Sequence, residues 1–83
     1  MSESRIIWKF LSREFTDDSP IIYLYVCGNV RSPITAVDNA MKLLKPIFYP
    51  CFSESYIKTI LVSFLDRKKE DYKKGLIKIK PLY

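Results

Sequence analysis

The chain has 83 residues, of which 48% are hydrophobic, 14% are aromatic and only two are glycine. This length and composition exclude a disordered or low-complexity chain and favour a single domain over residues 1–83. Fourteen lysines and arginines against nine aspartates and glutamates give a net charge of +5, which fits an anionic partner or simply a soluble surface.

Residues 5–15 form the first candidate element, and their pattern fits two conformations. Ile6, Trp8 and Phe10 fall on one side of an extended chain, opposite the basic residues, which predicts a half-buried strand. A second apolar set, spaced by three and four residues from Ile7 onward, fits a helix instead. We favour the strand because isoleucine, tryptophan and phenylalanine are typical of strands.

Residues 21–27 are predicted to be the central strand. The run IIYLYVC is β-branched and aromatic, and it is bounded by Pro20 and Gly28. It is apolar on both faces, as expected of a strand in the middle of a sheet. Residues 16–20, TDDSP, have turn chemistry and the length of a hairpin loop, so we expect this strand to pair with residues 5–15.

Residues 33–45 are predicted to form a helix. Ser32 would cap its N-terminus and Pro33 would take the first position, where the missing N–H is not needed. Pro46 disfavours helical backbone at the residue before it, so we expect the helix to end there. The following connector, residues 47–52, is apolar and aromatic, which predicts a buried crossing, with a short strand as the alternative.

Residues 54–74 carry the clearest helix pattern in the chain. Ser53 or Ser55 can cap the free N–H groups at its start, and Gly75 can adopt the left-handed conformation that ends it. The charged residues after position 65 are expected to project into solvent. One face is apolar at helical spacing, and it consists of Ile57, Ile60, Leu61, Phe64 and Leu65.

Residues 76–82 are predicted to be an edge strand. Isoleucines alternate with Lys78 and Lys80, which leaves one wet face. Pro81 lacks the N–H that an inner strand would donate, so the strand belongs at the edge. A rival interpretation pairs this segment with residues 56–65 as a hairpin, because the apolar residues there can also alternate.

The sequence therefore predicts an α+β fold with the element order β-β-α-α-β. A three-stranded sheet has residues 21–27 in its middle, and two helices cover one face. From residue 21 onward this order is similar to that of Alba-type chromatin and RNA-binding domains, with residues 47–52 in the place of a strand. The resemblance concerns element order alone and carries no site residue. The expected core consists of Ile22, Leu24, Val26, Val37, Met41, Ile57, Ile60, Leu61 and Phe64.

No catalytic site is predicted. The chain has no histidine, which removes the usual general base near neutral pH and any Ser/His or Cys/His pair. Asp17 and Asp18 are adjacent turn residues without further metal ligands nearby, and Cys27 has only Arg31 close in sequence to activate its thiol. We therefore expect no enzyme activity, no cofactor, no metal site and no small-molecule substrate.

The two cysteines predict a reduced setting. Cys27 and Cys51 lie in no CxxC or metal-ligand spacing, so we expect two small buried hydrophobic residues, with a disulfide between them as the alternative. Residues 1–5 are polar and open no secretory signal, and the longest apolar run, residues 21–27, is too short to span a bilayer. These observations favour a cytoplasmic protein without a membrane partner.

Alternation in the predicted sheet collects basic and aromatic residues on the face away from the helices. Such a face has the chemistry of platforms that bind single-stranded nucleic acid, which is the alternative function. It would also expose Ile7 and Leu11, an apolar area that a protein partner or a second copy would cover. The first hypothesis is therefore a non-enzymatic interaction module, self-associating as a homo-oligomer, that regulates or inhibits a larger protein. The predicted face consists of Lys9, Arg13, Tyr23, Tyr25, Lys78 and Lys80.

Overall fold

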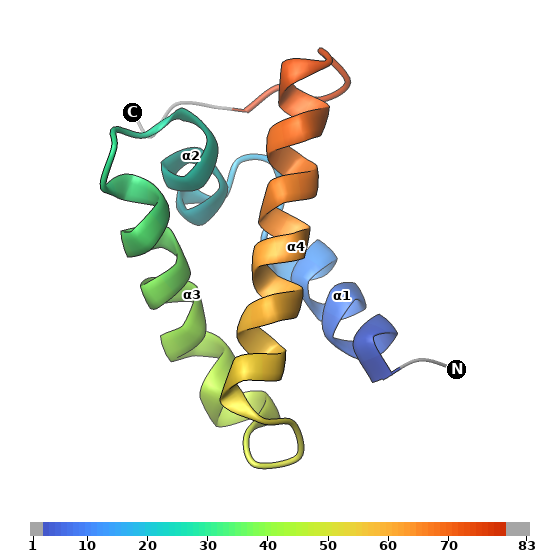
Figure 1. Cartoon of the computed structure of the whole chain (residues 1–83). Helices are drawn as coiled ribbons and strands as arrows, with labels where there is room; N and C mark the ends of the chain where they lie inside the picture. Colours follow the sequence, from blue (N-terminus) through green and yellow to red (C-terminus); the bar gives the residue numbers. More distant parts are fainter. Residues whose placement is uncertain (1–2, 80–83) are drawn as a thin grey trace.

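The computed structural model describes residues 3–79, and every regular element in this range is a helix (Figure 1). The four helices are α1 (Glu3–Glu14), α2 (Pro20–Cys27), α3 (Ser32–Phe48) and α4 (Glu54–Lys73). Because residues 3–79 contain no strand, the predicted α+β fold, with its three-stranded sheet and β-β-α-α-β order, is wrong. The similarity in element order to Alba-type domains is lost with the sheet.

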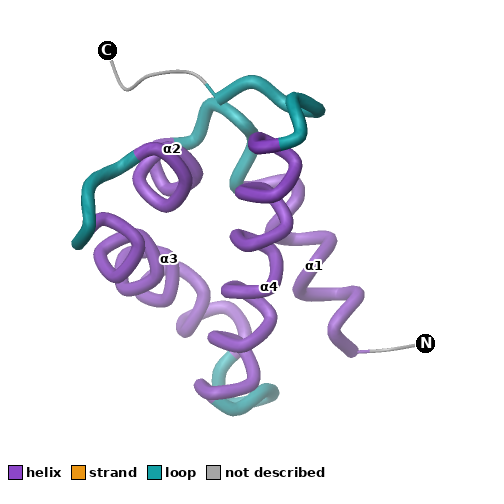
Figure 2. The backbone as a smooth tube through the Cα atoms, turned by 45° about the horizontal axis from the view of Figure 1, so that its top comes forward, coloured by secondary structure: helices purple, strands orange, loops and turns teal. Residues whose placement is uncertain are grey.

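Helix α4 is the element around which the other helices are arranged. In Figure 1 it stands between α3 and α1, and α2 lies near the upper ends of α3 and α4. The tilted view in Figure 2 shows the same arrangement. Helix α4 packs against each of the other three helices, and α2 also packs against α3. The longest helix therefore supplies the surface on which the domain is built.

All four helices contribute to one core. Each fully buried isoleucine or leucine stabilises the fold by about 1.5–3 kcal/mol through its removal from water. The predicted core positions on α3 and α4 are confirmed as buried, and so is Ile22 on α2. The largest side chains of the core with essentially no exposure are Ile7, Leu11, Ile22, Leu44, Ile57, Leu61 and Leu65.

Residues 5–15 are helical because helical spacing buries more of their apolar side chains in the core than two-residue alternation would. Ile7 and Leu11 are completely buried against the core, whereas Ile6 is 58% exposed. A strand would bury Ile6 and expose Ile7, and it would need a partner strand to satisfy its backbone. The predicted strand over residues 5–15 is therefore wrong, and the helical alternative is confirmed.

Helix α2 replaces the strand predicted over residues 21–27, and a capping signal explains the difference. The Ser19 hydroxyl accepts a hydrogen bond from the Ile21 N–H at 3.2 Å, and Pro20 takes the first position of the helix. Packing against α3 and α4 supports this short helix. Because residues two apart do not share a helix face, Leu24 turns away from Ile22 and is only half-buried, contrary to prediction.

Val26, also predicted to be buried, is half-buried as well, although it lies one turn beyond Ile22 and packs against the core. Its place near the C-terminal end of α2 leaves part of it in contact with solvent.

Helix α3 begins close to its predicted start but runs past its predicted end. The helix starts at Ser32, yet Arg31 occupies the cap position without a side-chain hydrogen bond, so the predicted Ser32 cap is wrong. Pro46 lies inside the helix, two residues before its last residue, and the side chain there is exposed, so the one lost backbone bond faces solvent. The continuation places Phe48 in the core, which offsets the effect of the proline.

The connector after α3 is neither a buried crossing nor a strand. Residues 47 and 48 belong to α3, and residues 49–53 form a short turn. Tyr49, Pro50 and Cys51 in this turn are exposed. Several apolar residues in the range 47–52 are therefore exposed at the protein surface, contrary to the prediction.

Helix α4 confirms the clearest prediction from the sequence. The Ser53 hydroxyl accepts a hydrogen bond from the Tyr56 N–H at 3.2 Å, and all five residues of the predicted stripe are buried. Gly75 has a positive φ of 75° just after the helix, the conformation expected of a stop. The rival hairpin over residues 56–65 is wrong because that range is helical.

The segment after Gly75 does not form the predicted edge strand where the structure describes it. Residues 76–79 are irregular, and Ile79 packs against the core while Lys78 is exposed. Residues 80–82, the rest of the predicted strand, lie outside the described residues.

Candidate interaction surfaces

The six residues of the predicted sheet face are not brought together on a sheet. Lys9 and Arg13 are exposed on α1, whereas Tyr23 and Tyr25 are half-buried on α2. Lys78 is exposed in the segment after α4, and Lys80 lies outside the described residues. The apolar residues expected on the same face, Ile7 and Leu11, are in the core instead.

Tyr25 is engaged in a contact between helices. Its hydroxyl donates a hydrogen bond to the Asp66 carboxylate on α4. Burial, followed by this hydrogen bond and the charge of Asp66, raises the pKa of Tyr25 to about 12. Tyr25 therefore ties α2 to α4 and is not free to act as a stacking platform.

A second contact between these helices involves Cys27, which lies at the end of α2. A hydrogen bond with Cys27 raises the pKa of Tyr72 on α4. Both cysteines are free; Cys27 is half-buried and Cys51 is exposed, so the prediction that both are buried is wrong. The 17 residues of α3 lie between them and span about 25 Å, far beyond the reach of a disulfide.

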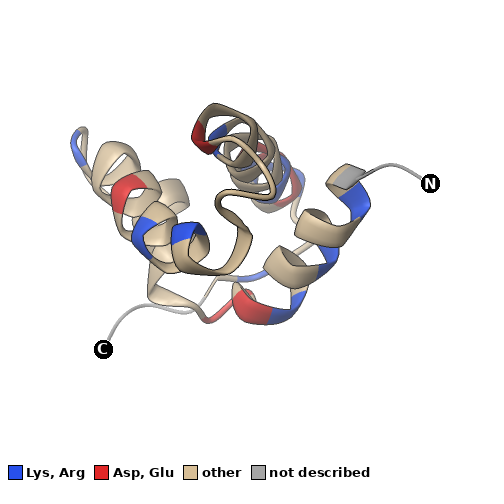
Figure 3. Cartoon of the chain, turned by 90° about the horizontal axis from the view of Figure 1, so that it is seen from below, with Lys and Arg blue, Asp and Glu red and all other residues tan. Residues whose placement is uncertain are grey.

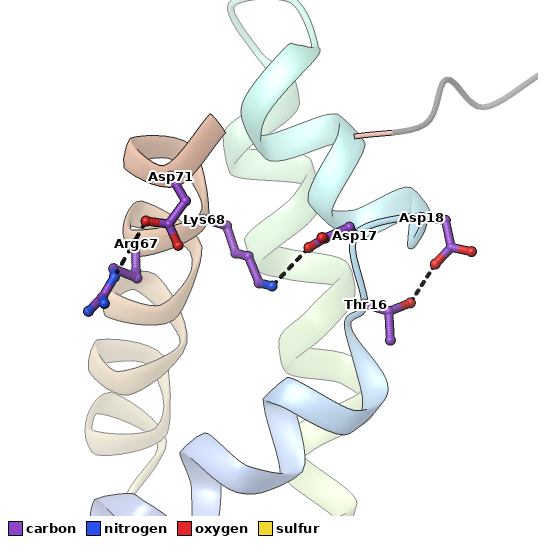
Figure 4. A network of polar contacts seen from close by, with 6 residues as sticks. All are labelled: Thr16, Asp17, Asp18, Arg67, Lys68 and Asp71. Carbon is purple, nitrogen blue, oxygen red and sulfur yellow. Dashed lines mark hydrogen bonds and ion pairs between the residues drawn. The ribbon is translucent and has the colours of Figure 1, made fainter. Parts of the chain in front are cut away.

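The loop between α1 and α2 is anchored by an ion pair. Figure 4 shows Lys68 of α4 pointing toward Asp17, with 2.9 Å between the ammonium nitrogen and the carboxylate oxygen. The Lys68 ammonium also lies over the Phe64 ring, 5.6 Å from its centre. The neighbouring Asp18 accepts a hydrogen bond from Thr16 at 2.6 Å.

These contacts give the aspartates of the turn a structural role. Asp17 is more than a solvated turn residue, because it draws part of the charged end of α4 onto the loop. Lys68 is half-buried as a result, so the expectation that this end projects freely into solvent is wrong for that residue. Within residues 3–79, no three side chains of histidine, cysteine, aspartate or glutamate gather closely enough to hold a metal ion.

Four large apolar residues on α1 and α3, two helices linked by one ring contact, are exposed or half-buried, and we call them the α1–α3 apolar surface. Ile6 and Phe10 are one turn apart on α1, and Leu43 and Ile47 are one turn apart on α3. The Phe10 ring meets the ring of Phe48, the residue after Ile47, edge to face with the ring centres 5.3 Å apart, which links α1 to the end of α3.

The members of this surface are substantially exposed. Ile6 is 58% exposed, Leu43 45% and Ile47 48%, while Phe10 is half-buried. A further exposed apolar residue, Val30 at 95%, lies in the loop before α3, at the other end of that helix. The α1–α3 apolar surface thus stands apart from the exposed apolar residues near the start of α3.

A basic stripe runs along the solvent side of α1. Arg5, Lys9 and Arg13 follow one another at four-residue intervals, so they share one face of the helix. Figure 3 shows the corresponding blue segments along the helix next to the N-terminus. Arg13 lies 3.9 Å from Glu14, whereas Arg5 and Lys9 have no ion pair within residues 3–79.

The basic stripe borders a surface hollow that we call the Trp8 groove. Its larger part has a volume of about 540 Å³, and a second part of about 230 Å³ lies between α1 and α4. The two parts share Trp8 and Ser12. The larger part is lined by Ser4, Arg5, Ile6, Trp8, Lys9 and Ser12.

Comparisons with known protein families, curated proteins and solved structures find no match to this chain. In the part of the chain that the structure describes, no helix combines the length and apolar character needed to cross a membrane.

Proposed function

We propose that this chain is a non-enzymatic interaction module whose α1–α3 apolar surface binds a second copy of the chain. The observation that carries the proposal is the exposure of Ile6, Leu43 and Ile47 beside the Phe10–Phe48 contact. Exposed apolar residues that gather in one place mark interaction sites more often than scattered ones do. The absence of histidine from the sequence supports a non-enzymatic role.

The exposed area is sufficient for a weak dimer. About half of each of the three most exposed side chains remains in water, so a symmetric dimer would bury about three whole side chains, worth roughly 5–9 kcal/mol. Association costs about 4–15 kcal/mol in lost freedom of motion. With the full gain and the lowest cost, about 5 kcal/mol remains, which corresponds to a dissociation constant of about 0.2 mM.

The charge of the chain sets how this dimer responds to salt. Two copies that each carry +5 repel one another, and salt shortens the range of that repulsion from about 10 Å at 0.1 M to about 3 Å at 1 M. Burial of apolar surface is not weakened by this screening. We therefore expect the dimer to become tighter as the salt concentration rises.

The same proposal includes a role as a regulator or inhibitor of a larger protein in the cytoplasm. A small module with one apolar surface can exchange its second copy for a larger protein, which is how it would act as a regulator or inhibitor. Two free thiols, one of them exposed, are compatible with the reducing cytoplasm.

Sedimentation equilibrium between about 10 μM and 1 mM protein tests the proposal. Ile47→Lys should weaken the dimer by about tenfold or more, because it places a charge in the buried surface. Val30→Lys is the matched control: it also replaces an exposed β-branched residue with lysine, but away from the surface. Circular dichroism verifies that both variants remain helical. A strict monomer over the whole range, or equal weakening by both variants, would contradict the proposal.

A further inference from the structure

We propose that the Trp8 groove binds single-stranded nucleic acid, with phosphates on the basic stripe of α1 and a base against Trp8. This site shares Ile6 with the α1–α3 apolar surface but otherwise uses other residues, and it is not the sheet face expected from the sequence. It combines the two elements that such binding requires, a row of cations and an accessible aromatic ring in a hollow.

Two cations of α1 are free to meet phosphates and the third, Arg13, has only a 3.9 Å contact with Glu14 on the surface, whereas those on the α4 side are already engaged. Arg67 pairs with Asp71 at 3.6 Å, and Lys68 pairs with Asp17. Arg5 and Lys9 have no such partner within residues 3–79. The positive potential of the groove is therefore concentrated along α1, opposite the ion pairs of α4.

The spacing of the basic stripe suits a polymer of phosphates. Arg5, Lys9 and Arg13 follow one another about 6 Å apart along the helix axis. Successive phosphates of an extended single strand lie at a comparable distance. Three cations in a row can therefore contact three neighbouring phosphates without bending the strand.

Trp8 supplies the surface for a base. Its ring packs edge to face on Phe64, with the ring centres 5.4 Å apart and the planes at 81°. Trp8 is half-buried, and its side chain lines both parts of the groove. The contact with Phe64 holds the indole in place, so little side-chain freedom is lost when a base stacks on it. An acidic peptide would use the cations but leave the indole unused.

Trp8 also provides the measurement, because it is the one tryptophan in the chain. We would titrate the protein with a single-stranded oligothymidylate of about ten nucleotides and follow tryptophan fluorescence. Stacking should change the emission of Trp8. With three phosphate contacts, log K should fall against log salt with a slope of about −2, so affinity should drop about 20-fold between 50 and 200 mM salt.

Charge variants separate this groove from general attraction to a basic chain. The double variant Arg5→Gln, Lys9→Gln should flatten the slope to about −0.7, so affinity should drop only about threefold over the same salt range. Lys42→Gln, a control on an exposed cation of α3, should keep the steep slope. The titration uses protein below the concentration at which the proposed dimer forms.

Three results would overturn the inference: no binding at 50 mM salt, an unchanged Trp8 emission on binding, or the same salt slope for Lys42→Gln as for the double variant Arg5→Gln, Lys9→Gln. Polyglutamate of the same charge that bound as tightly as the oligonucleotide would also overturn it and would identify an acidic protein as the ligand. None of these results bears on the proposed dimer, because salt acts on the two associations in opposite directions.

Discussion

Replacing neighbouring isoleucines in α1 tests the register of that helix. Ile7 is completely buried and Ile6 is 58% exposed, whereas a strand over the same residues would reverse the two. Ile7→Ala removes a buried side chain and leaves a cavity, so it should lower the free energy of unfolding by about 2–5 kcal/mol. Ile6→Ala deletes atoms that are largely in water and should cost less than about 1 kcal/mol.

Urea denaturation followed by the fluorescence of Trp8, on the same helix, provides the assay. A chain of this size has a total stability of about 4–12 kcal/mol, so Ile7→Ala should remove a large part of it. With a slope near 1 kcal/mol per molar urea, the midpoint should fall by about 2 M or more. Protein concentrations in the low micromolar range keep self-association out of the comparison. A larger loss for Ile6→Ala than for Ile7→Ala would refute the helical register.

Two further predictions concern the polar contacts of α4. The pKa of Tyr25 is raised from 10.0 to about 12, so its contact with Asp66 stabilises the fold fully below about pH 10 and is lost as the pH rises toward 12. After allowance for solvent screening the loss is on the order of 1 kcal/mol. Urea denaturation at several alkaline pH values should show a steeper decline for the wild type than for Tyr25→Phe, and equal declines would disprove the assignment. Lys68→Met keeps the apolar stem but breaks the pair with Asp17, so the free energy of unfolding measured by urea denaturation should fall by about 0.5–1 kcal/mol. The control Lys42→Met should have little effect. An equal loss from both variants would argue against the anchoring role of the ion pair.

The second half of the fold could be predicted from the sequence because its signals agree. Between Ser53 and Gly75 a cap, an apolar stripe and a stop all indicate a helix, and the structure places its ends within one residue of the prediction. The helix predicted over residues 33–45 is also confirmed, although Pro46 does not end it. Burial of Phe48 outweighs the local preference of a proline near a helix end.

The first half could not be predicted in the same way, because its apolar pattern fits both a strand and a helix. Residues 21–27 are rich in β-branched and aromatic side chains, and a short apolar run does not distinguish a buried strand from a buried helix. The Ser19–Pro20 pair carries the same kind of helix signal as Ser32–Pro33, but the turn chemistry of residues 16–20 also fits the end of a hairpin loop. Tertiary packing then decided the conformation.

The residues that share a candidate surface depend on whether the first half of the chain is strand or helix. Two-residue alternation grouped Lys9 and Arg13 with tyrosines that in fact lie on another helix. Four-residue spacing groups them with Arg5 instead, and Arg5 and Lys9 line the groove that Trp8 also lines. The helical alternative for residues 5–15 concerned only the apolar residues from Ile7 onward and did not include this grouping. The α1–α3 apolar surface also depends on the position of Phe48, which no local pattern reveals.

The most direct test of the proposed function is the dissociation constant of the dimer measured at low and high salt by sedimentation equilibrium. We expect a constant of about 0.2 mM that decreases as salt rises from about 0.1 to 1 M, and that increases about tenfold or more in Ile47→Lys but not in Val30→Lys. A monomer at every concentration and salt would contradict the claim that the α1–α3 apolar surface binds a second copy.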